Sequence, residues 1–392
     1  MSEKLIIRNF GPITNVELDL RKVNVLIGES GTGKSTIAKV LSFCKYFTNI
    51  QGGYFEEETQ ENKNTGIDEI ENNLNKWGLL EYINEDSFVS YECEHYIFSF
   101  DNKIWNRTAE NLIDNTYNTE KVYHLTSKIK PKTATFKNIL NDYLRLDNIA
   151  DFFKWLGVIM NYPFYVYGER TLQSIFSMGK DFTSNLSDPL FKFFVDVDKI
   201  QRNYKKITEI KPLNIEYKNV EGRGEIRKVG ESKFISLNNA ASGYMSVIPI
   251  VLIINYYKEF RKKKKSFIIE EPELNIFPTT QNELIKFICE NLSGMNNLVL
   301  TTHSPYILTS LNNLMFAYKT GLDHFEEVDK IIPSKYWLNP EDVSAYRLNE
   351  GGISEQIIDK EGLIRTSKID EASKILNTEF NKVFDLEFSV EK

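Results

Sequence analysis

A glycine-rich segment near the N-terminus contains the first residues that could do chemistry. Residues 28–36 read Gly-Glu-Ser-Gly-Thr-Gly-Lys-Ser-Thr, between an apolar run at residues 23–27 and a helical pattern that begins at Lys34. A strand, a loop and a helix in this order wrap backbone N–H groups around phosphates. The lysine of this pattern reaches the β- and γ-phosphates, and the next hydroxyl ligates Mg²⁺. The sequence therefore predicts a site for ATP and Mg²⁺ with these contacts: Gly28, Ser30, Gly31, Gly33, Lys34, Ser35 and Thr36.

Two adjacent carboxylates follow an apolar run much later in the chain. Residues 267–269 read Phe-Ile-Ile, and Glu270 and Glu271 come next. Because successive side chains of a strand point to opposite sides, the two acids cannot do the same work. We expect Glu270 to support Mg²⁺, directly or through water, and Glu271 to orient and deprotonate the attacking water. An acidic pair alone is usually a solvated strand end, but the glycine-rich segment upstream favours the catalytic interpretation.

A histidine follows the next apolar run. Residues 298–300 read Leu-Val-Leu, and His303 lies in the segment Thr-Thr-His-Ser-Pro that begins at residue 301. One helical pattern separates His303 from Glu271, which is the spacing of one αβ unit. We therefore expect His303 at the tip of the neighbouring strand, beside the γ-phosphate. A lone histidine is more often structural, but this position favours a catalytic role.

Ser242 and Gly243 precede a strongly apolar helical run at residues 247–254. One interpretation is a serine N-cap in front of a core helix. The other is that this helix start faces the γ-phosphate bound to a second subunit. The local sequence leaves both open.

The bulk composition restricts the class of protein. The chain has 392 residues, a formal net charge of −7 and three cysteines, Cys44, Cys93 and Cys289, which are too far apart for a zinc pair or a disulfide framework. The longest apolar stretch, residues 247–257, is about half of the ~20 residues that span a bilayer. The first residues lack the pattern of a signal peptide. These features predict a cytoplasmic protein without a membrane partner.

The hydrophobic patterns alternate between strands and helices and predict an α/β fold. Strands are expected at residues 5–7, 16–20, 23–27, 213–237, 267–269, 298–301 and 344–348, with a hairpin at 87–100. Helices are expected at residues 34–47, 245–261, 281–292 and 371–384, and over most of 136–210 with breaks at 162–163 and 187–189. A polar connector is expected at residues 51–66. We therefore divide the chain into four parts: residues 1–50, 51–210, 211–327 and 328–392.

Together these segments resemble the ATP-binding-cassette (ABC) ATPases of the SMC and RecF type, and more narrowly the OLD-like ATPases of bacterial anti-phage systems. The resemblance rests on residues 6–13, on Glu-Glu-Pro-Glu at residues 270–273 with Pro278 after it, and on Thr-His-Ser-Pro at residues 302–305. It implies a P-loop ATPase head with a mixed sheet, an antiparallel β subdomain and an inserted, mainly helical lobe. It also implies a head-to-head homodimer with two ATP molecules between the P-loop of one subunit and the signature motif, Ser242 and Gly243, of the other.

The chain departs from this group at two positions and resembles it at one further segment. Ala241 stands where the signature motif usually has a serine, and Asn275 stands where the group often has a histidine. Residues 167–170, Tyr-Gly-Glu-Arg, resemble a segment of these ATPases that ends in an arginine near the nucleotide. The resemblance therefore implies a nucleotide contact for Arg170, against the alternative of a surface arginine in a turn.

Two functions from different classes remain open. One is a regulatory ATPase that controls a separately encoded effector, a nuclease or a toxin, in an anti-phage system. The other is a RecF-like or SMC-like repair ATPase that binds DNA directly, for which basic runs at residues 128–132, 205–206 and 261–265 are candidates. A nuclease domain within this chain is not expected, because the carboxylates after residue 328, including Asp359, Glu361 and Asp370, are scattered. The acidic net charge favours the regulator.

Overall fold

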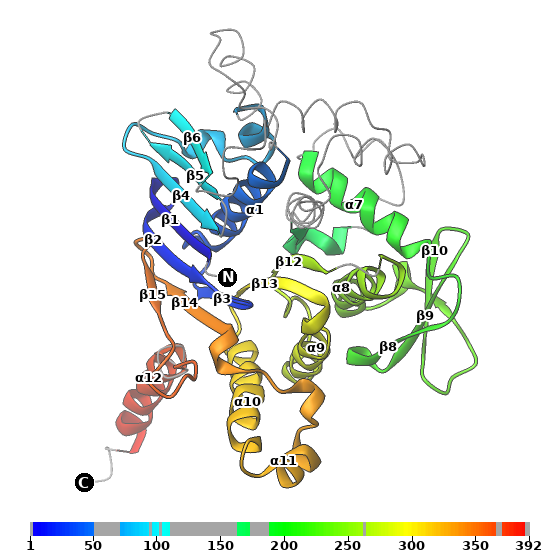
Figure 1. Cartoon of the computed structure of the whole chain (residues 1–392). Coiled ribbons are helices and arrows are strands. Elements are labelled where there is room, and N and C mark those ends of the chain that lie inside the picture. The colour runs from blue at the N-terminus through cyan, green and yellow to red at the C-terminus, as the bar shows by residue number, and fades with distance from the viewer. Residues whose placement is uncertain are drawn as a thin grey trace, which may run out of the picture.

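The computed structural model describes residues 3–50, 71–93, 96–101, 104–109, 163–172, 188–261, 264–365 and 371–388. The expected connector at residues 51–66 and most of the expected helical stretch before residue 188 lie outside these ranges. The described residues form three sheets with helices around them (Figure 1). This arrangement confirms the predicted α/β class.

A six-stranded sheet lies at the centre, in the order β15-β14-β3-β13-β12-β7. Its strands pair in parallel except β15, which is antiparallel to β14. The strands are β3 (Val23–Gly28), β7 (Phe164–Val166), β12 (Lys265–Glu270), β13 (Met295–Thr302), β14 (Val343–Leu348) and β15 (Ser354–Gln356). Helices cover both faces, which explains why the central strands are nearly continuous apolar runs.

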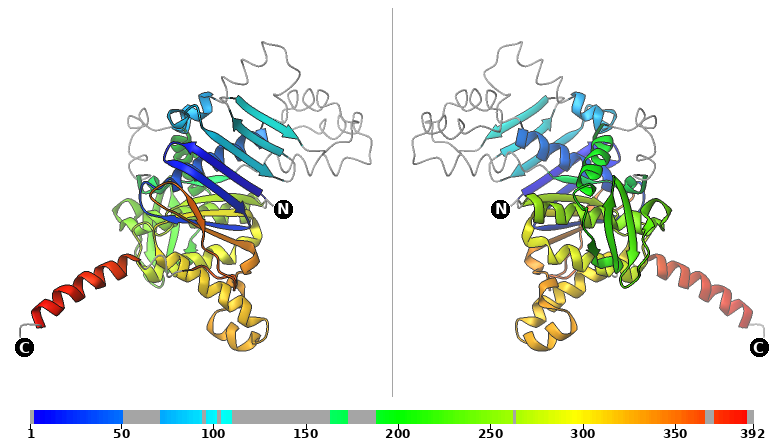
Figure 2. Two further views of the ribbon diagram at one scale, coloured as in Figure 1. Left: turned by 90° about the vertical axis from the view of Figure 1, so that its left-hand side faces the viewer. Right: turned by 90° about the vertical axis from the view of Figure 1, so that its right-hand side faces the viewer.

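Figure 1 shows α1 (Lys34–Ile50) on one side of this sheet and α9 (Pro278–Glu290) with α10 (Pro305–Gly321) on the other. The remaining helices are α7 (Asp188–Gln201), α8 (Ser242–Tyr256), α11 (Phe325–Ile331) and α12 (Glu371–Phe388), and α8 continues into a π-helical turn at Tyr257–Arg261. Every residue of α8 from Ser246 to Ile254 is buried, so this helix is part of the core. By contrast, α12 projects away from the body of the molecule (Figure 2).

Two antiparallel sheets flank the centre. The first has the order β2-β1-β4-β5-β6 and is built from β1 (Glu3–Phe10), β2 (Ile13–Leu20), β4 (Phe88–Cys93), β5 (Tyr96–Asp101) and β6 (Ile104–Ala109). The second has the order β11-β10-β9-β8 and is built from β8 (Thr208–Ile210), β9 (Ile215–Val220), β10 (Arg223–Lys228) and β11 (Ile235–Ser236). They confirm the hairpin expected at residues 87–100 and the strands expected at residues 213–237.

A local expectation differs from the structure at one strand of the main sheet. Residues 164–166, expected within a helical stretch, are strand β7, which pairs with β12. α7 begins at Asp188, within the break expected at residues 187–189, and Pro189 occupies its first turn, where a missing N–H costs nothing. The strand expected at residues 344–348 is β14, which pairs with β3 in the main sheet.

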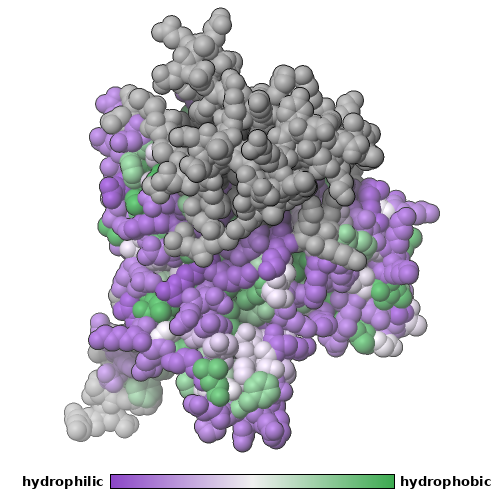
Figure 3. Space-filling model, in the orientation of Figure 1, coloured by the Kyte–Doolittle hydropathy of each residue, from purple (hydrophilic) through white to green (hydrophobic). Residues whose placement is uncertain are grey.

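On the face that Figure 3 shows, the coloured surface is mostly polar, and a group of apolar residues lies at the tip formed by α10 and α11. Phe316 is 57% exposed and Ile331 is 79% exposed there. No helix among the described residues is long and apolar enough to cross a membrane.

Candidate functional site

The carboxyl ends of three neighbouring strands bring the predicted site residues to one edge of the main sheet. β13 lies between β3 and β12, and all three run parallel. They end at Gly28, Glu270 and Thr302. Segments far apart in the sequence therefore meet where open α/β sheets bind ligands.

The loop after β3 has the backbone of a phosphate-binding loop. Gly31 and Gly33 have φ angles of +82° and +94°, which favour glycine. Gly28 is needed for another reason: a Cβ there would lie 2.5 Å from the carbonyl oxygen of Leu348 in β14. Ser30, Gly31 and Ser35 are exposed, whereas Thr36 is buried. The start of α1 thus offers N–H groups and the Ser35 hydroxyl at an open surface.

Lys34 is folded over this loop and is only 5% exposed. Its Nζ donates hydrogen bonds to the carbonyl oxygens of Gly28 at 2.8 Å and Glu29 at 2.7 Å. Burial lowers the pKa of Lys34 to about 8, against the opposing effect of nearby carboxylates, of which Glu271 acts most strongly. The negative charge of nucleotide phosphates would stabilise the charged form of this buried ammonium group, so the loop fits ATP.

The predicted base, Glu271, lies directly after β12 in an unusual backbone conformation. Its φ is +42°, in the left-handed region that non-glycine residues rarely adopt. Its N–H donates to the carbonyl oxygen of Thr301 at 2.8 Å, which ties it to the neighbouring strand. One carboxylate oxygen lies 3.2 Å from Nε2 of His303, and both side chains are about one third exposed. The structure therefore brings the predicted base and the predicted histidine into contact where a substrate can reach them.

Glu270 points to the opposite side of the strand and is only 5% exposed. One carboxylate oxygen accepts a hydrogen bond from the Tyr165 hydroxyl at 2.8 Å, and the other accepts one from the Gly168 N–H at 3.2 Å. Since a carboxylate has about four acceptor positions, these two donors leave capacity for Mg²⁺ or for a water bound to it. Glu270 and the exposed Ser35 hydroxyl are oxygen donors of the kind that Mg²⁺ prefers, so the residues fit this ion.

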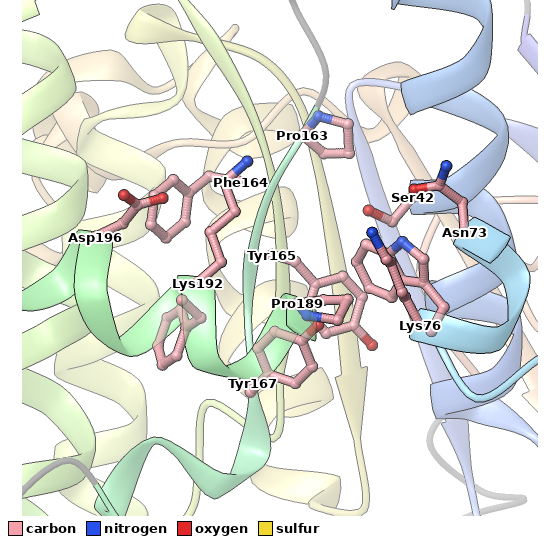
Figure 4. Close-up of a pocket in the computed structure, with 12 residues that line it drawn as sticks. Ser42, Asn73, Lys76, Pro163, Phe164, Tyr165, Tyr167, Pro189, Lys192 and Asp196 are labelled. Atoms are coloured by element: carbon pink, nitrogen blue, oxygen red, sulfur yellow. The ribbon is translucent and has the colours of Figure 1, made fainter. Parts of the chain in front are cut away.

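Aromatic side chains hold Tyr165 in place behind Glu270. The rings of Tyr165 and Tyr167 are 4.6 Å apart, and Trp77 packs on Tyr165 at 5.5 Å. These residues line a cavity of about 320 Å³ that also borders α1 and α7 (Figure 4). The sequence contained a signal for this strand, an aromatic and β-branched run, Phe-Tyr-Val-Tyr, between Pro163 and Gly168.

Glu273 is a site residue to which sequence reasoning gave no role. Its Oε1 accepts two hydrogen bonds, from the Thr302 hydroxyl and from the His303 N–H, both at 2.7 Å. Its Oε2 is buried and has no hydrogen-bond partner. Glu273 therefore fixes the turn after β12 to the turn after β13 and positions the backbone of His303.

The hydrogen-bond partners of Arg170 are backbone carbonyl groups of this chain, and Arg170 is not the surface residue of the alternative interpretation. The nucleotide contact that the resemblance implies stays a prediction. Its side chain is 0% exposed. Nε donates to the carbonyl oxygen of Ser246 at 2.8 Å, Nη1 to that of Glu270 at 2.8 Å, and Nη2 to that of Glu271 at 2.6 Å. Nη1 also donates to the carbonyl oxygen of Tyr167 at 3.2 Å. Burial lowers the pKa of Arg170 to about 10, a value at which it stays charged at neutral pH.

Ser242 and Gly243 form the first turn of α8. The N-cap of this helix is Ala241 and makes no side-chain capping bond, so the interpretation of Ser242 as a capping serine is wrong. Ser242 is exposed. A Cβ on Gly243 would lie 2.7 Å from the carbonyl oxygen of Asn275, which places the start of α8 against the turn after β12. The contact of Ser242 and Gly243 with a second subunit's nucleotide stays a prediction.

Among the described residues, no group of three or more His, Cys, Asp and Glu side chains is arranged to hold a metal ion. Two residues of the basic run at residues 261–265 differ in exposure, because Lys264 is exposed and Lys265 is buried. Lys265 is only 8% exposed, and its ammonium lies 5.7 Å from the centre of the Tyr257 ring. Burial lowers the pKa of Lys265 to about 8.

Comparison with known proteins gives one family. The sequence model of the AAA ATPase domain matches residues 52–308, a range that begins after the phosphate-binding loop and covers more than half of the chain. No curated protein matches the sequence.

Similar solved structures include three SMC heads. The SMC head domain from Thermotoga maritima is 11% identical, with a TM-score of 0.38 and coverage of 79% of this chain and 91% of that one. An Smc head bound to the C-terminal winged-helix domain of ScpA is 9% identical, with a TM-score of 0.43 and coverage of 91% and 96%. An Smc head with an extended coiled coil, bound to the C-terminal domain of ScpA derived from Pyrococcus furiosus, is 10% identical, with a TM-score of 0.40 and coverage of 96% and 98%.

Proposed function

Because the chain belongs to the AAA ATPase domain family, we propose that it binds ATP with Mg²⁺ and hydrolyses it in a head-to-head homodimer. The observation that carries the proposal is the contact of Glu271 with His303 at the edge where Lys34 lies. This edge combines a cation for the phosphates, a carboxylate for the attacking water and an imidazole beside it.

The side chains divide the work of hydrolysis in this proposal. The loop N–H groups and Lys34 bind the phosphates, and Ser35 with Glu270 would hold Mg²⁺, which neutralises phosphate charge when bound. Glu271 accepts a proton from water as the water oxygen attacks the γ-phosphorus and the bond to ADP breaks. His303 lies 3.2 Å from Glu271 and orients that carboxylate or contacts the γ-phosphate. Most of the rate gain comes from positioning and charge, as in other phosphoryl transfers.

The dimer part of the proposal rests on Ser242 and Gly243. They lie at an exposed helix start, where backbone N–H groups favour anions, and the helix behind them is buried and rigid. A second subunit's ATP would meet this surface.

Mixed dimers test the shared site. Lys34→Ala should lose nucleotide binding, and Ser242→Arg should bind nucleotide but not hydrolyse it. A mixture of the two contains heterodimers in which one composite site has both an intact P-loop and an intact signature motif. Phosphate release should therefore return on mixing. Full activity of Ser242→Arg by itself would remove the second subunit from the mechanism.

We further propose that this ATPase works in the cytoplasm as the regulator of a separate nuclease or toxin in an anti-phage system. Support for this role is the sequence resemblance at residues 6–13, 270–273 and 302–305 together with the acidic net charge of −7. Affinity purification from cells with ATP present, using Glu271→Gln to slow turnover, should recover a nuclease or toxin. Recovery of DNA repair proteins and chromosomal DNA instead would favour the alternative, a RecF-like ATPase.

The DNA-binding alternative has less support at residues 261–265 than the sequence suggested, because Lys265 is buried. The exposed cations Lys264, Lys205 and Lys206 remain candidates. Duplex DNA affinity should be measured over a salt series for the wild type and for a triple Gln variant at these positions. A shallower salt dependence in the variant would support DNA contact there.

A further inference from the structure

One buried side chain connects the helix that carries the signature motif with the acid pair of the same subunit. We propose that Arg170 is a positioning residue that couples the two ATP sites of the dimer to each other. This inference rests on the proposed head-to-head dimer and adds a structural connection between its two ATP sites.

The contacts of Arg170 reach two elements that meet different nucleotides. Nε binds the carbonyl of Ser246 in the second turn of α8, four residues after Ser242. Nη1 and Nη2 bind the carbonyls of Glu270 and Glu271. In the dimer, Ser242 faces the ATP on the partner's P-loop, whereas Glu271 acts on the ATP of its own subunit. Arg170 therefore lies between the two composite sites.

The connection is stiff. A planar guanidinium with fixed N–H directions holds its acceptors in one geometry. With 0% exposure, Arg170 has no water to replace a lost bond, so movement of the Ser246 carbonyl must move the arginine or break a buried hydrogen bond. Gly243 adds a second contact, because the space for its Cβ is filled by the carbonyl oxygen of Asn275. The start of α8 and the turn after β12 are thus expected to shift together.

Glu271 is well placed to respond to such a shift. Its φ of +42° is an infrequent conformation, and it is supported by the Arg170 bond to its carbonyl and by its own N–H bond to Thr301. A conformation that depends on its neighbours changes when they move. Closure of α8 on one ATP would therefore adjust the base at the other ATP, which makes hydrolysis cooperative.

Arg170→Lys tests the coupling. It keeps a positive charge, but the three N–H groups of an ammonium cannot replace the hydrogen bonds of Arg170 to four carbonyls. For wild type, the rate of phosphate release should rise with ATP concentration with a Hill coefficient well above 1, towards the limit of 2 for two sites. For Arg170→Lys, we expect a Hill coefficient clearly below the wild-type value and a lower kcat, while the ATP-dependent dimer still forms.

Tyr204→Phe is the matched control. The Tyr204 hydroxyl donates to the carbonyl of Leu252 at 2.8 Å, so this variant also removes a buried hydrogen bond to α8, but at a carbonyl that lies further along the helix than that of Ser246. It should lower the melting temperature and keep the Hill coefficient. Equal loss of cooperativity in Tyr204→Phe and Arg170→Lys would show that general loosening of α8 is sufficient and would overturn the specific role of Arg170.

A measurement with an unaltered Arg170 covers the case in which Arg170→Lys does not fold. Heterodimers are formed from a Glu271→Gln subunit, which holds ATP, and a ¹⁵N-labelled Lys34→Ala subunit, which cannot bind it. ATP should then slow hydrogen exchange at residues 270–276 of the labelled subunit severalfold, although its own P-loop is empty. Unchanged exchange there would overturn the coupling.

The outcomes separate this inference from the proposed function. If ATP produces no dimer in light scattering, both fail. If the dimer forms and hydrolyses ATP but the wild type has a Hill coefficient of 1, or Arg170→Lys keeps the wild-type value, the proposed function stands and the coupling is wrong.

Discussion

His303 Nε2 lies 3.2 Å from a carboxylate oxygen of Glu271, although the two residues come from the ends of different strands. The turn that carries His303 is held by Glu273, which accepts a hydrogen bond from the His303 N–H at 2.7 Å. The proposed base, the histidine and the glutamate that fixes the histidine turn thus belong to two adjacent turns.

Replacement of the proposed base, Glu271, should separate nucleotide binding from turnover. Glu271→Gln keeps the shape and the carbonyl bond to Arg170 but removes the acceptor for the water proton. We expect phosphate release to fall by about 10²- to 10⁴-fold, with nucleotide binding retained and the ATP dimer accumulating. Light scattering measures the dimer, and a phosphate-release assay measures turnover. Glu283→Gln, an exposed carboxylate on α9, is the control, and equal effects of the two substitutions would exclude Glu271 as the base.

Substitution of Glu273 by Ala or by Gln should have different effects on the kcat. Glu273→Ala removes the acceptor of two hydrogen bonds and frees the His303 turn, at an expected cost of about 1–3 kcal/mol in the free energy of unfolding. The kcat should fall while the KM for ATP changes little, because Glu273 is not placed to bind the nucleotide. Glu273→Gln keeps one oxygen acceptor and should restore much of the kcat. Identical kcat values for Ala and Gln would contradict the positioning role.

Nucleotide affinity should weaken at alkaline pH. Burial lowers the pKa of Lys34 to about 8 in the free protein. Below this pH the ammonium is charged and ready for phosphates; as pH rises above it, binding must take up a proton. The Kd for ADP should therefore rise above pH 8, by up to about tenfold per pH unit. Fluorescent ADP titrations at several pH values measure this effect, and Lys34→Arg, which stays charged, should show a flat profile.

A methyl group at Gly243 should disturb the site from a distance. Its Cβ would lie 2.7 Å from the carbonyl oxygen of Asn275, so the start of α8 must move. We expect Gly243→Ala to lower the free energy of unfolding by about 1–3 kcal/mol and to reduce phosphate release. At Gly294, by contrast, a Cβ would meet nothing within 4 Å. Gly294→Ala should leave both thermal unfolding and activity near wild type, and a similar loss in both variants would argue against the contact.

The sequence predicted the central strands and the polar residues at their ends because these depend on local patterns. Residues 23–27, 267–269 and 298–301 are apolar runs that end in polar residues, and all three are strands at one sheet edge. Glu271 and His303 were expected close together from their spacing alone, and they are in contact.

What the sequence did not predict depends on partners far away in the chain. β7 has only three residues, so its aromatic and β-branched run is a short signal, and its pairing with β12 does not follow from the local sequence. Glu273 accepts a hydrogen bond from the His303 N–H, and Arg170 donates to carbonyl oxygens of other segments. Every residue but proline has both backbone groups, so these partners leave no mark on the sequence.

β14 lies beside β3, and the carbonyl of Leu348 packs against Gly28. During synthesis, β3 therefore cannot complete its pairing until β14 has been made, 320 residues later. At about 5–20 residues per second, the wait is roughly 15 to 60 s. Until then β3 has exposed N–H and C=O groups, which makes the nascent chain prone to aggregation. The nucleotide site is thus completed only after β14 has been made, long after the synthesis of its own phosphate loop.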